Sequence, residues 1–145
     1  MSIKITPSTH PVSAAERVEK LANPGFGKYY TDHMVVAQWT ENDGWGQAEL
    51  KAYAPISLDP AAMVFHYGQE IFEGLKAYRQ PDGGIALFRP EANAARFARS
   101  ARRLALPELP VESFLDSIYA LVKQDASWVP DKVGESLYLR PFMFA

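Results

Sequence analysis

The thirteen residues from Tyr67 to Arg79, YGQEIFEGLKAYR, constrain this chain more than any other stretch. They combine two glycines, aromatic side chains five positions apart and a basic end, which neither a simple amphipathic helix nor a single strand requires. We predict a short helical turn over 69–73 that ends at a left-handed Gly74, followed by a strand. Tyr67 and Phe72 then flank a sharp change of chain direction, where side chains converge on a small molecule. The alternative is a loop whose aromatic rings only fill the core.

Composition sets the broad class of protein. The chain has 145 residues, of which 48% are hydrophobic and 22% charged, as is ordinary for one soluble globular domain. Its net charge of −2 gives no basis for a nucleic-acid surface or a polybasic membrane anchor. The absence of cysteine excludes disulfides and thiolate metal sites. We find neither a secretory leader nor an apolar run of ~20 residues, so we expect a cytoplasmic protein without a membrane partner.

Two turn signals predict two β-hairpins. The first surrounds Asp43-Gly44, and the second surrounds the Pro-Asp-Gly-Gly run that begins at Pro81. The predicted strands are 34–39 with 47–53, and 76–80 with 84–89. Two shorter strands are predicted near the ends of the chain, at 3–5 and 136–140.

Three helices are predicted. Ser13 and Glu16 form a capping box that starts a short helix ending near Leu21. Pro90 suits the first turn of a helix that runs to about Leu106. A packing helix without chemistry is predicted at 111–126 from the spacing of Phe114, Leu115, Ile118, Leu121 and Val122. Together these elements predict an α+β fold, with a mostly antiparallel sheet of about five or six strands and two long helices on one face.

Arginines recur on one face of the predicted helix that begins at Pro90. They are Arg96, Arg99 and Arg103, with Ser100 among them. The apolar face carries Phe97, Ala101 and Leu104. Like charges at this spacing repel by a few tenths of a kcal/mol per pair, so the stripe requires either water or an anion to offset the repulsion. We leave Arg99, Arg102 and Arg103 as surface or interface residues.

His33 allows two interpretations. Its imidazole suits general acid–base catalysis, with the neighbouring Asp32 as the group that orients it. Adjacent residues of a strand point to opposite faces, however, so Asp32 is poorly placed for this and we expect a structural role. His10 and His66 show no i, i+4 pairing with it or with each other, so we expect no metal site.

Four segments, in order along the chain, resemble one family of enzymes. They are FGKYYTDHMVVAQW at 26–39, HYGQEIFEGLKAYR at 66–79, LFRPEANAARFARSARRL at 87–104 and LYLRPFMFA at 137–145. These segments resemble the branched-chain aminotransferases, which are fold-type-IV enzymes that use pyridoxal 5'-phosphate. The resemblance implies the smaller N-terminal domain of a two-domain enzyme. We therefore divide the chain into an arm with a short helix at 1–25 and the aminotransferase domain at 26–145.

The resemblance implies a site, residue by residue. It places Arg96 on the cofactor phosphate, where a planar guanidinium donates parallel charge-assisted bonds. It places Arg140 at the mouth of a substrate pocket whose walls are Phe26, Tyr67, Phe72 and Tyr138. An uncharged aromatic pocket suits leucine, isoleucine and valine and their 2-oxo acids, each side chain contributing ~1.5–3 kcal/mol on full burial. For glutamate or 2-oxoglutarate, the partner is left open between Arg140 and a neighbouring subunit of the homodimer that the resemblance implies.

The chemistry of pyridoxal phosphate requires a lysine that binds the cofactor covalently. The chain has lysines at positions 4, 20, 28, 51, 76, 123 and 132, and none lies in a segment that resembles the family's cofactor lysine. Lys76 lies within the FEGLKAYR motif, but no base is implied beside it. The resemblance thus implies no catalytic residue in this chain, and we expect the fragment alone to be inactive.

Other functions stay open on the sequence alone. Either the chain acts by itself as a non-catalytic interaction or assembly domain, or it comes from a related D-amino acid aminotransferase or aminodeoxychorismate lyase. The TDHM and FEGLKAYR segments weigh against the related enzymes. The coding sequence beyond Ala145 would separate the interaction domain from the aminotransferase.

Overall fold

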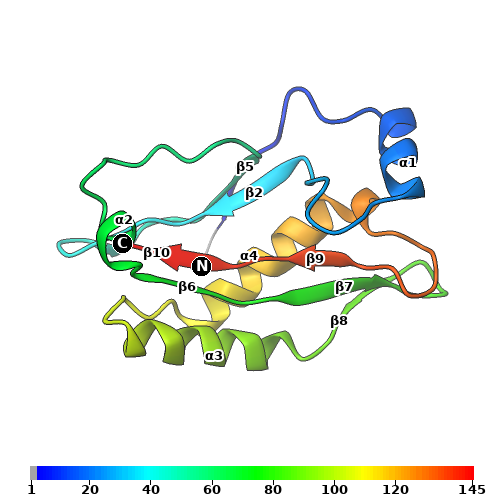
Figure 1. The fold of residues 1–145 in the computed structure, drawn as a ribbon. Helices are drawn as coiled ribbons and strands as arrows, with labels where there is room; N and C mark the ends of the chain where they lie inside the picture. The colour runs from blue at the N-terminus through cyan, green and yellow to red at the C-terminus, as the bar shows by residue number, and fades with distance from the viewer. Residues whose placement is uncertain (1–2) are drawn as a thin grey trace.

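A computed structural model describes residues 3–145, which adopt the α+β arrangement that the sequence predicts (Figure 1). The helices are α1 (Ala14–Ala22), α2 (Met63–Tyr67), α3 (Pro90–Arg103) and α4 (Val111–Gln124), followed by the 3₁₀ turn η1 (Ala126–Trp128). The strands are β1 (Lys4–Thr6), β2 (His33–Val36), β3 (Trp39–Thr40), β4 (Gly44–Trp45), β5 (Glu49–Ala52), β6 (Glu70–Phe72), β7 (Leu75–Arg79), β8 (Ile85–Leu87), β9 (Leu137–Leu139) and β10 (Phe142–Phe144). Within residues 3–145, no helix combines the length and the apolar character that crossing a membrane requires.

The strands form small sheets instead of one continuous sheet. The strand orders are β1-β5-β2, β8-β7-β9, β10-β6 and β3-β4. Every pairing between described strands is antiparallel except that of β1 with β5. The antiparallel character is therefore as predicted, whereas the prediction of a single sheet of five or six strands is wrong.

Two of these sheets are parts of one longer antiparallel pair. The same register holds in β6 with β10 and in β7 with β9, on either side of a gap of two residues in each strand. Within the gap, the Glu73 N–H still donates to the Pro141 carbonyl at 2.8 Å. Pro141 has no N–H to donate in return, which ends the ladder there. The gap separates the sheets and, as described below, positions the candidate site.

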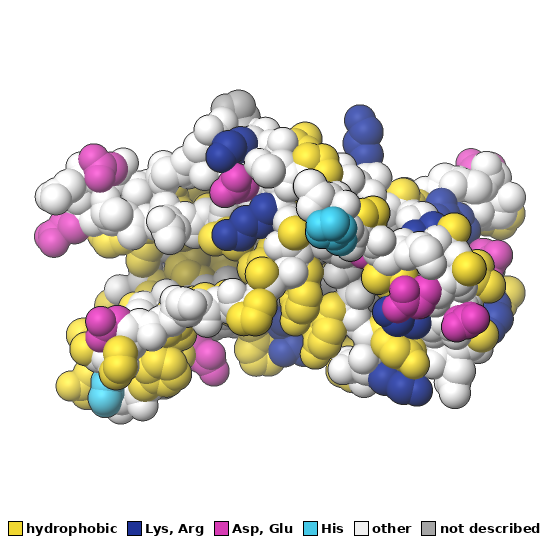
Figure 2. Space-filling model, turned by 90° about the horizontal axis from the view of Figure 1, so that it is seen from above, with side chains coloured by type: hydrophobic (Ala, Val, Ile, Leu, Met, Phe, Trp, Pro, Cys, Tyr) yellow, Lys and Arg dark blue, Asp and Glu magenta, His cyan; other side chains and the backbone are white. Residues whose placement is uncertain are grey.

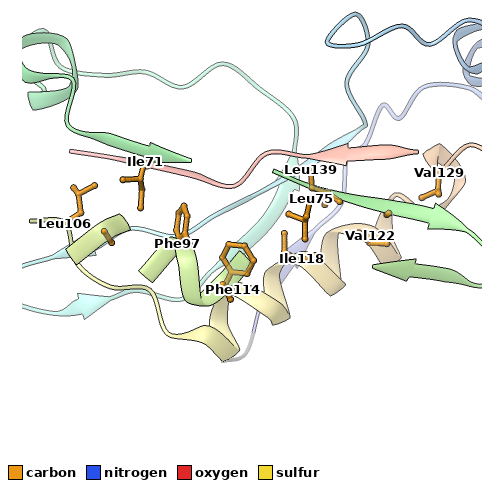
Figure 3. Close-up of a cluster of buried hydrophobic side chains, with 12 residues drawn as sticks. Ile71, Leu75, Phe97, Leu106, Phe114, Ile118, Val122, Val129 and Leu139 are labelled. Atoms are coloured by element: carbon orange, nitrogen blue, oxygen red, sulfur yellow. The ribbon is translucent and has the colours of Figure 1, made fainter. Parts of the chain in front are cut away.

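Helices α3 and α4 lie on one side of these strands, as the sequence predicts (Figures 1 and 3). Between helices and strands lies a core of buried side chains that includes Ile71, Leu75, Phe97, Phe114, Ile118, Val122 and Leu139. The rings of Phe97 and Phe114 meet at 5.4 Å between centroids and join the two helices. Leu104, expected on the apolar face of α3, is instead 39% exposed, because α3 ends one residue earlier.

The N-terminal half confirms several predictions from local sequence. The Ser13 hydroxyl accepts the Glu16 N–H at 3.2 Å and caps α1. Strands β2 and β5 form the predicted hairpin partners, with Leu50 fully buried between them and the helices. The predicted strand near the start of the chain is β1, which pairs with β5, and β7 with β8 forms the second hairpin.

The central stretch departs from its predicted local structure. The sequence predicts a helical turn over 69–73, but strand β6 occupies this segment and the helix α2 precedes it. The left-handed residue that ends the helix is Gly68, with φ of 58°, and not Gly74. The prediction is wrong because either glycine can end a helix, and because β6 finds its partner in β10, about seventy residues later along the chain.

A buried polar network ties the N-terminal arm to the end of α4. His33 is 6% exposed, and its backbone N–H and its Nδ1 contact the Asp125 carboxylate at 3.1 and 2.6 Å. Its Nε2 accepts the Ser8 N–H at 2.9 Å, so the proton lies on Nδ1 and the imidazole is neutral. Asp32 binds other partners and does not orient His33, as the sequence predicts. These contacts give His33 the structural role expected of it.

Replacing Asp125 tests that role. Asp125→Ala should lower the free energy of unfolding by about 2–4 kcal/mol, because two buried donors of His33 lose their acceptor. Asp131→Ala, at an exposed loop position, is the matched control and should change it by less than about 0.5 kcal/mol. Chemical denaturation of the protein that carries this chain measures both variants. Equal losses would contradict the structural role of His33.

Candidate active site

Four of the predicted site residues meet on the face of the paired strands that points away from the core. These residues, the aromatic cluster, are Phe26, Phe72, Tyr138 and Arg140. The Phe26 ring meets the edge of the Tyr138 ring at 5.2 Å between centroids. Arg140 donates from Nη2 and Nε to the Tyr138 hydroxyl at 3.0 and 3.3 Å. The same guanidinium lies 4.5 Å from the centroid of the Phe72 ring, within the range of a cation–π interaction.

Strand alternation explains why these side chains share a face. Leu139 is buried, so Tyr138 and Arg140 on either side of it point outward, as the sequence predicts. Ile71 is likewise buried, and Phe72 beside it points outward. A buried ion pair for Arg140, the alternative role, is not formed, because Arg140 is exposed and its described partners are Tyr138 and Phe72.

Gly74 allows Tyr138 to lie where it does. A Cβ atom built on Gly74 would clash with the Tyr138 hydroxyl and would lie 2.9 Å from the ring carbon Cζ. Gly74 therefore allows close approach of a side chain from the neighbouring strand, and the left-handed conformation that the sequence predicts is not its reason. The position of the Tyr138 phenol depends on the absence of a side chain at this point.

Glu73 binds Arg96 on the other side of the same strand. Its carboxylate is 4% exposed and accepts from Arg96 Nε at 2.6 Å and Nη2 at 2.7 Å. Asn93, one turn earlier on α3, donates to the same carboxylate at 2.8 Å and to the Gly74 carbonyl at 3.1 Å. The Arg96 side chain is 57% exposed, so the pair joins a buried anion to a cation at the surface.

The pKa values of this pair follow from these contacts. Burial raises the pKa of Glu73, but hydrogen bonds from Arg96 and Asn93 outweigh burial, and the pKa lies below its ordinary value. The hydrogen bond to Glu73 raises the pKa of Arg96, so both groups are charged at neutral pH. The two charges together make the Phe72–Gly74 segment electrically neutral on this side.

The arginine face of α3 borders a hollow of about 330 Å³. Its lining residues are Ile71, Arg96, Arg99, Ser100, Arg103 and Leu104. The predicted arginine stripe is thus present on one face, and Arg102 points away to pair with Glu108 at 2.7 Å. No residue of the aromatic cluster lines this hollow, because Ile71 and Phe72 point to opposite faces of β6. Arg96 and the aromatic rings are joined through Glu73 and Gly74, and not across this hollow.

Tyr67 lies apart from the other predicted residues. It is the last residue of α2 and is 76% exposed. Its ring contact among the described residues is with His66, at 6.3 Å between centroids. The structure therefore gathers four of the five predicted pocket residues and leaves Tyr67 at the surface. Among residues 3–145, no group of three or more His, Asp or Glu side chains is arranged to hold a metal ion.

Apolar side chains remain open to solvent around the site. Phe26 is 77% exposed and Phe72 is 62% exposed. Figure 2 shows a hollowed face of the molecule, along which hydrophobic side chains gather. Exposed apolar area of this extent marks a surface that binds ligands or partners.

Sequence reasoning missed Glu73 and Asn93. The Arg96 partner lies 23 residues earlier in the chain, and no periodicity links the two positions. A signal for Gly74 was present, because a glycine inside a strand marks close approach of another group. The sequence does not identify which group approaches, since Tyr138 comes from a strand that follows both helices.

Solved structures of aminotransferases share this fold. The chain aligns with Escherichia coli branched-chain amino acid aminotransferase at a TM-score of 0.54 and 21% identity, over 66% of this chain and 30% of that one. It aligns with a second solved branched-chain amino acid aminotransferase, from T.th. and with pyridoxamine 5'-phosphate, at a TM-score of 0.56 and 22% identity, over 80% and 33% of the two chains. The fold is that of the N-terminal part of the fold-type-IV aminotransferases.

Sequence relatives are more specific. The chain is 62% identical over 145 residues to a probable branched-chain-amino-acid aminotransferase of Streptomyces coelicolor, covering 99% of this chain and 40% of that protein. It is 58% identical over 146 residues to the Mycolicibacterium smegmatis branched-chain-amino-acid aminotransferase, covering 100% and 40%. No family profile matches the chain. The resemblance to the N-terminal part of branched-chain-amino-acid aminotransferases is confirmed, and the chain spans about two fifths of the length of these relatives.

A methyl group at position 74 tests the seat of Tyr138. Gly74→Ala should destabilise the protein by about 1–3 kcal/mol, because the added Cβ clashes with the Tyr138 phenol. Tyr138→Phe removes the hydroxyl and should recover part of that loss in the double variant. Gly46→Ala, whose Cβ would meet only the Gln38 carbonyl at 3.4 Å, is the control and should be nearly neutral. Thermal or denaturant unfolding gives these values, and purely additive losses would contradict the packing of Tyr138 on Gly74.

Glu73 should also make stability depend on pH. Its folded pKa lies below the ordinary value of 4.5, so its stabilising effect is complete above 4.5 and is lost as the pH falls through the folded pKa. Glu73→Gln should therefore reduce the decrease in the free energy of unfolding between neutral pH and about pH 3. Glu91→Gln, exposed in the first turn of α3, should leave that decrease unchanged. Identical pH profiles for the original protein and Glu73→Gln would refute this account.

Proposed function

We propose that this chain supplies the N-terminal part of the active site of a branched-chain amino acid aminotransferase. Such an enzyme transfers an amino group between leucine, isoleucine or valine and 2-oxoglutarate. The proposal rests on one observation above all: three consecutive residues, Phe72 to Gly74, connect an exposed phosphate-binding guanidinium on one side with the aromatic cluster on the other. The names of the sequence relatives support the same activity.

The residues present fit pyridoxal 5'-phosphate as the cofactor. A guanidinium has five N–H donors, and Glu73 receives two donors of Arg96. The others remain available on a side chain that is 57% exposed, which suits a phosphate group. When bound, the cofactor would supply an electron sink for the carbon from which the amino group leaves. Arg96 would bind its phosphate and fix its orientation.

The aromatic cluster would bind the substrate. Phe26, Phe72 and Tyr138 form an uncharged apolar wall, which excludes water and suits an aliphatic side chain. Arg140 lies at its edge and retains donors beyond those bound to Tyr138, so it would bind the second carboxylate of glutamate or 2-oxoglutarate. Tyr67 as a further wall of this pocket stays a prediction, because it lies apart in this chain.

We assign no catalytic residue to this chain. Lys76 is exposed on β7 and pairs in register with Tyr138, but nothing beside it would serve as a base for proton transfer. The lysine that binds the cofactor covalently is therefore proposed to lie outside these 145 residues. A homodimer in the cytoplasm is proposed with it. The D-amino acid aminotransferases and aminodeoxychorismate lyases find no support in the names of the relatives above.

Cofactor affinity tests the proposal. In the protein that carries this chain, Arg96→Gln should weaken binding of pyridoxal phosphate by about 10–100-fold, which corresponds to the ~1.5–3 kcal/mol of a charge-assisted hydrogen bond. Binding of pyridoxal, which has no phosphate, should be unchanged. Arg102→Gln is the matched control, since Arg102 lies on the same helix and also pairs with a glutamate. Spectroscopic titration with the two compounds gives the dissociation constants.

Two outcomes would overturn the proposal. One is a protein that transfers the amino group of D-alanine but not that of leucine, isoleucine or valine. The other concerns the cofactor amine: borohydride reduction of the loaded protein, followed by peptide mapping, should label a lysine outside these 145 residues. A stoichiometric label on Lys76 would show that the chain carries its own cofactor lysine.

A further inference from the structure

The Glu73–Arg96 pair has a geometry that a stabilising ion pair does not require. Replacing a buried ion pair with apolar residues is often neutral or stabilising, so a buried carboxylate is weak evidence of a role in stability. Here the carboxylate is buried and the guanidinium is 57% exposed, whereas in the Arg102–Glu108 pair both side chains are exposed. Arg96 thus has a fixed anchor at the end of a side chain that reaches solvent.

The anchor itself cannot move freely. Glu73 lies in the gap between β6 and β7, and its N–H donates to the Pro141 carbonyl at 2.8 Å. Asn93 holds its carboxylate from α3 and binds the Gly74 carbonyl as well. The carboxylate is therefore fixed from the neighbouring strand and from the helix that carries Arg96.

The contact also selects which edge of the guanidinium is used. Glu73 receives Nε and Nη2, the side edge of the planar group, at 2.6 and 2.7 Å. The end edge, with Nη1 and the second hydrogen of Nη2, is left for another anion. An arginine side chain otherwise carries ~2 kcal/mol of rotamer entropy, part of which would be lost on binding.

We propose that Glu73 is a positioning residue, which holds the Arg96 guanidinium so that its end edge faces the cofactor phosphate. The inference rests on the proposed function, because it assumes that Arg96 binds that phosphate. Glu73 itself touches neither cofactor nor substrate. It acts by orienting Arg96 before the cofactor binds, so that less side-chain freedom is lost on binding.

Charge and positioning predict opposite effects of neutralising Glu73. Glu73→Gln removes a negative charge beside a phosphate site, so the electrostatic effect alone would tighten phosphate binding. Positioning predicts the reverse, because the freed guanidinium samples other rotamers. A purely structural role predicts equal changes for ligands with and without a phosphate. The sign and the phosphate dependence of the change therefore separate the three roles.

The experiment compares pyridoxal phosphate with pyridoxal in the protein that carries this chain. Glu73→Gln should weaken pyridoxal phosphate about 10-fold, the lower end of the loss seen when a group that orients a ligand is removed, and should leave pyridoxal unchanged. Glu108→Gln, which breaks the matched pair on the same helix, should change neither. In an Arg96→Gln background, Glu73→Gln should cause no further loss.

Each other result has a definite meaning. Tighter binding of pyridoxal phosphate to Glu73→Gln, or equal weakening of both compounds, would overturn the positioning role. If Arg96→Gln reduces phosphate-dependent affinity and Glu73→Gln does not, this inference fails while the proposed function stands. If Arg96→Gln has no effect, both fail. Should Glu73→Gln not fold, Glu73→Asp keeps the charge but is too short to receive both donors, and it should show a smaller phosphate-dependent loss.

Discussion

The candidate site depends on one buried carboxylate. Glu73 is closed off from water at the gap between two strands, and its charge is offset by donors from α3. An unpaired carboxylate at that depth would be destabilising by several kcal/mol, so helix and strands are held in one arrangement. Phe72 and Gly74, on either side of it, then have fixed positions relative to Arg96. The geometry of both faces of the strand follows from this contact.

Much of the fold could be predicted from the sequence, because its causes are local. The Ser13 cap, the turn at Asp43-Gly44 and the apolar spacing of α4 each act within a few residues of the feature that they determine. Alternation along β9 likewise placed Tyr138 and Arg140 on one face. The resemblance to aminotransferases supplied the remaining candidates, which no local rule identifies.

The parts that could not be predicted involve distant segments of the chain. Glu73 meets Arg96 only because β6 packs against α3, and β6 is a strand only because β10 pairs with it. The choice between Gly68 and Gly74 as the left-handed residue depends on that same pairing. Sequence periodicity contains no information on contacts of this kind. The separation of Tyr67 from the aromatic cluster belongs to the same class of result.

The matched gap in the paired strands has a consequence for variation in length. The ladder resumes in the same register after two residues in each strand, at 73–74 and at 140–141. Inserting or deleting one residue in either segment would turn every following side chain to the opposite face, and would expose Leu75 while burying Lys76. Loops elsewhere in the chain have no such restriction. In this fold, the number of residues in the gap is therefore as strictly limited as their chemistry.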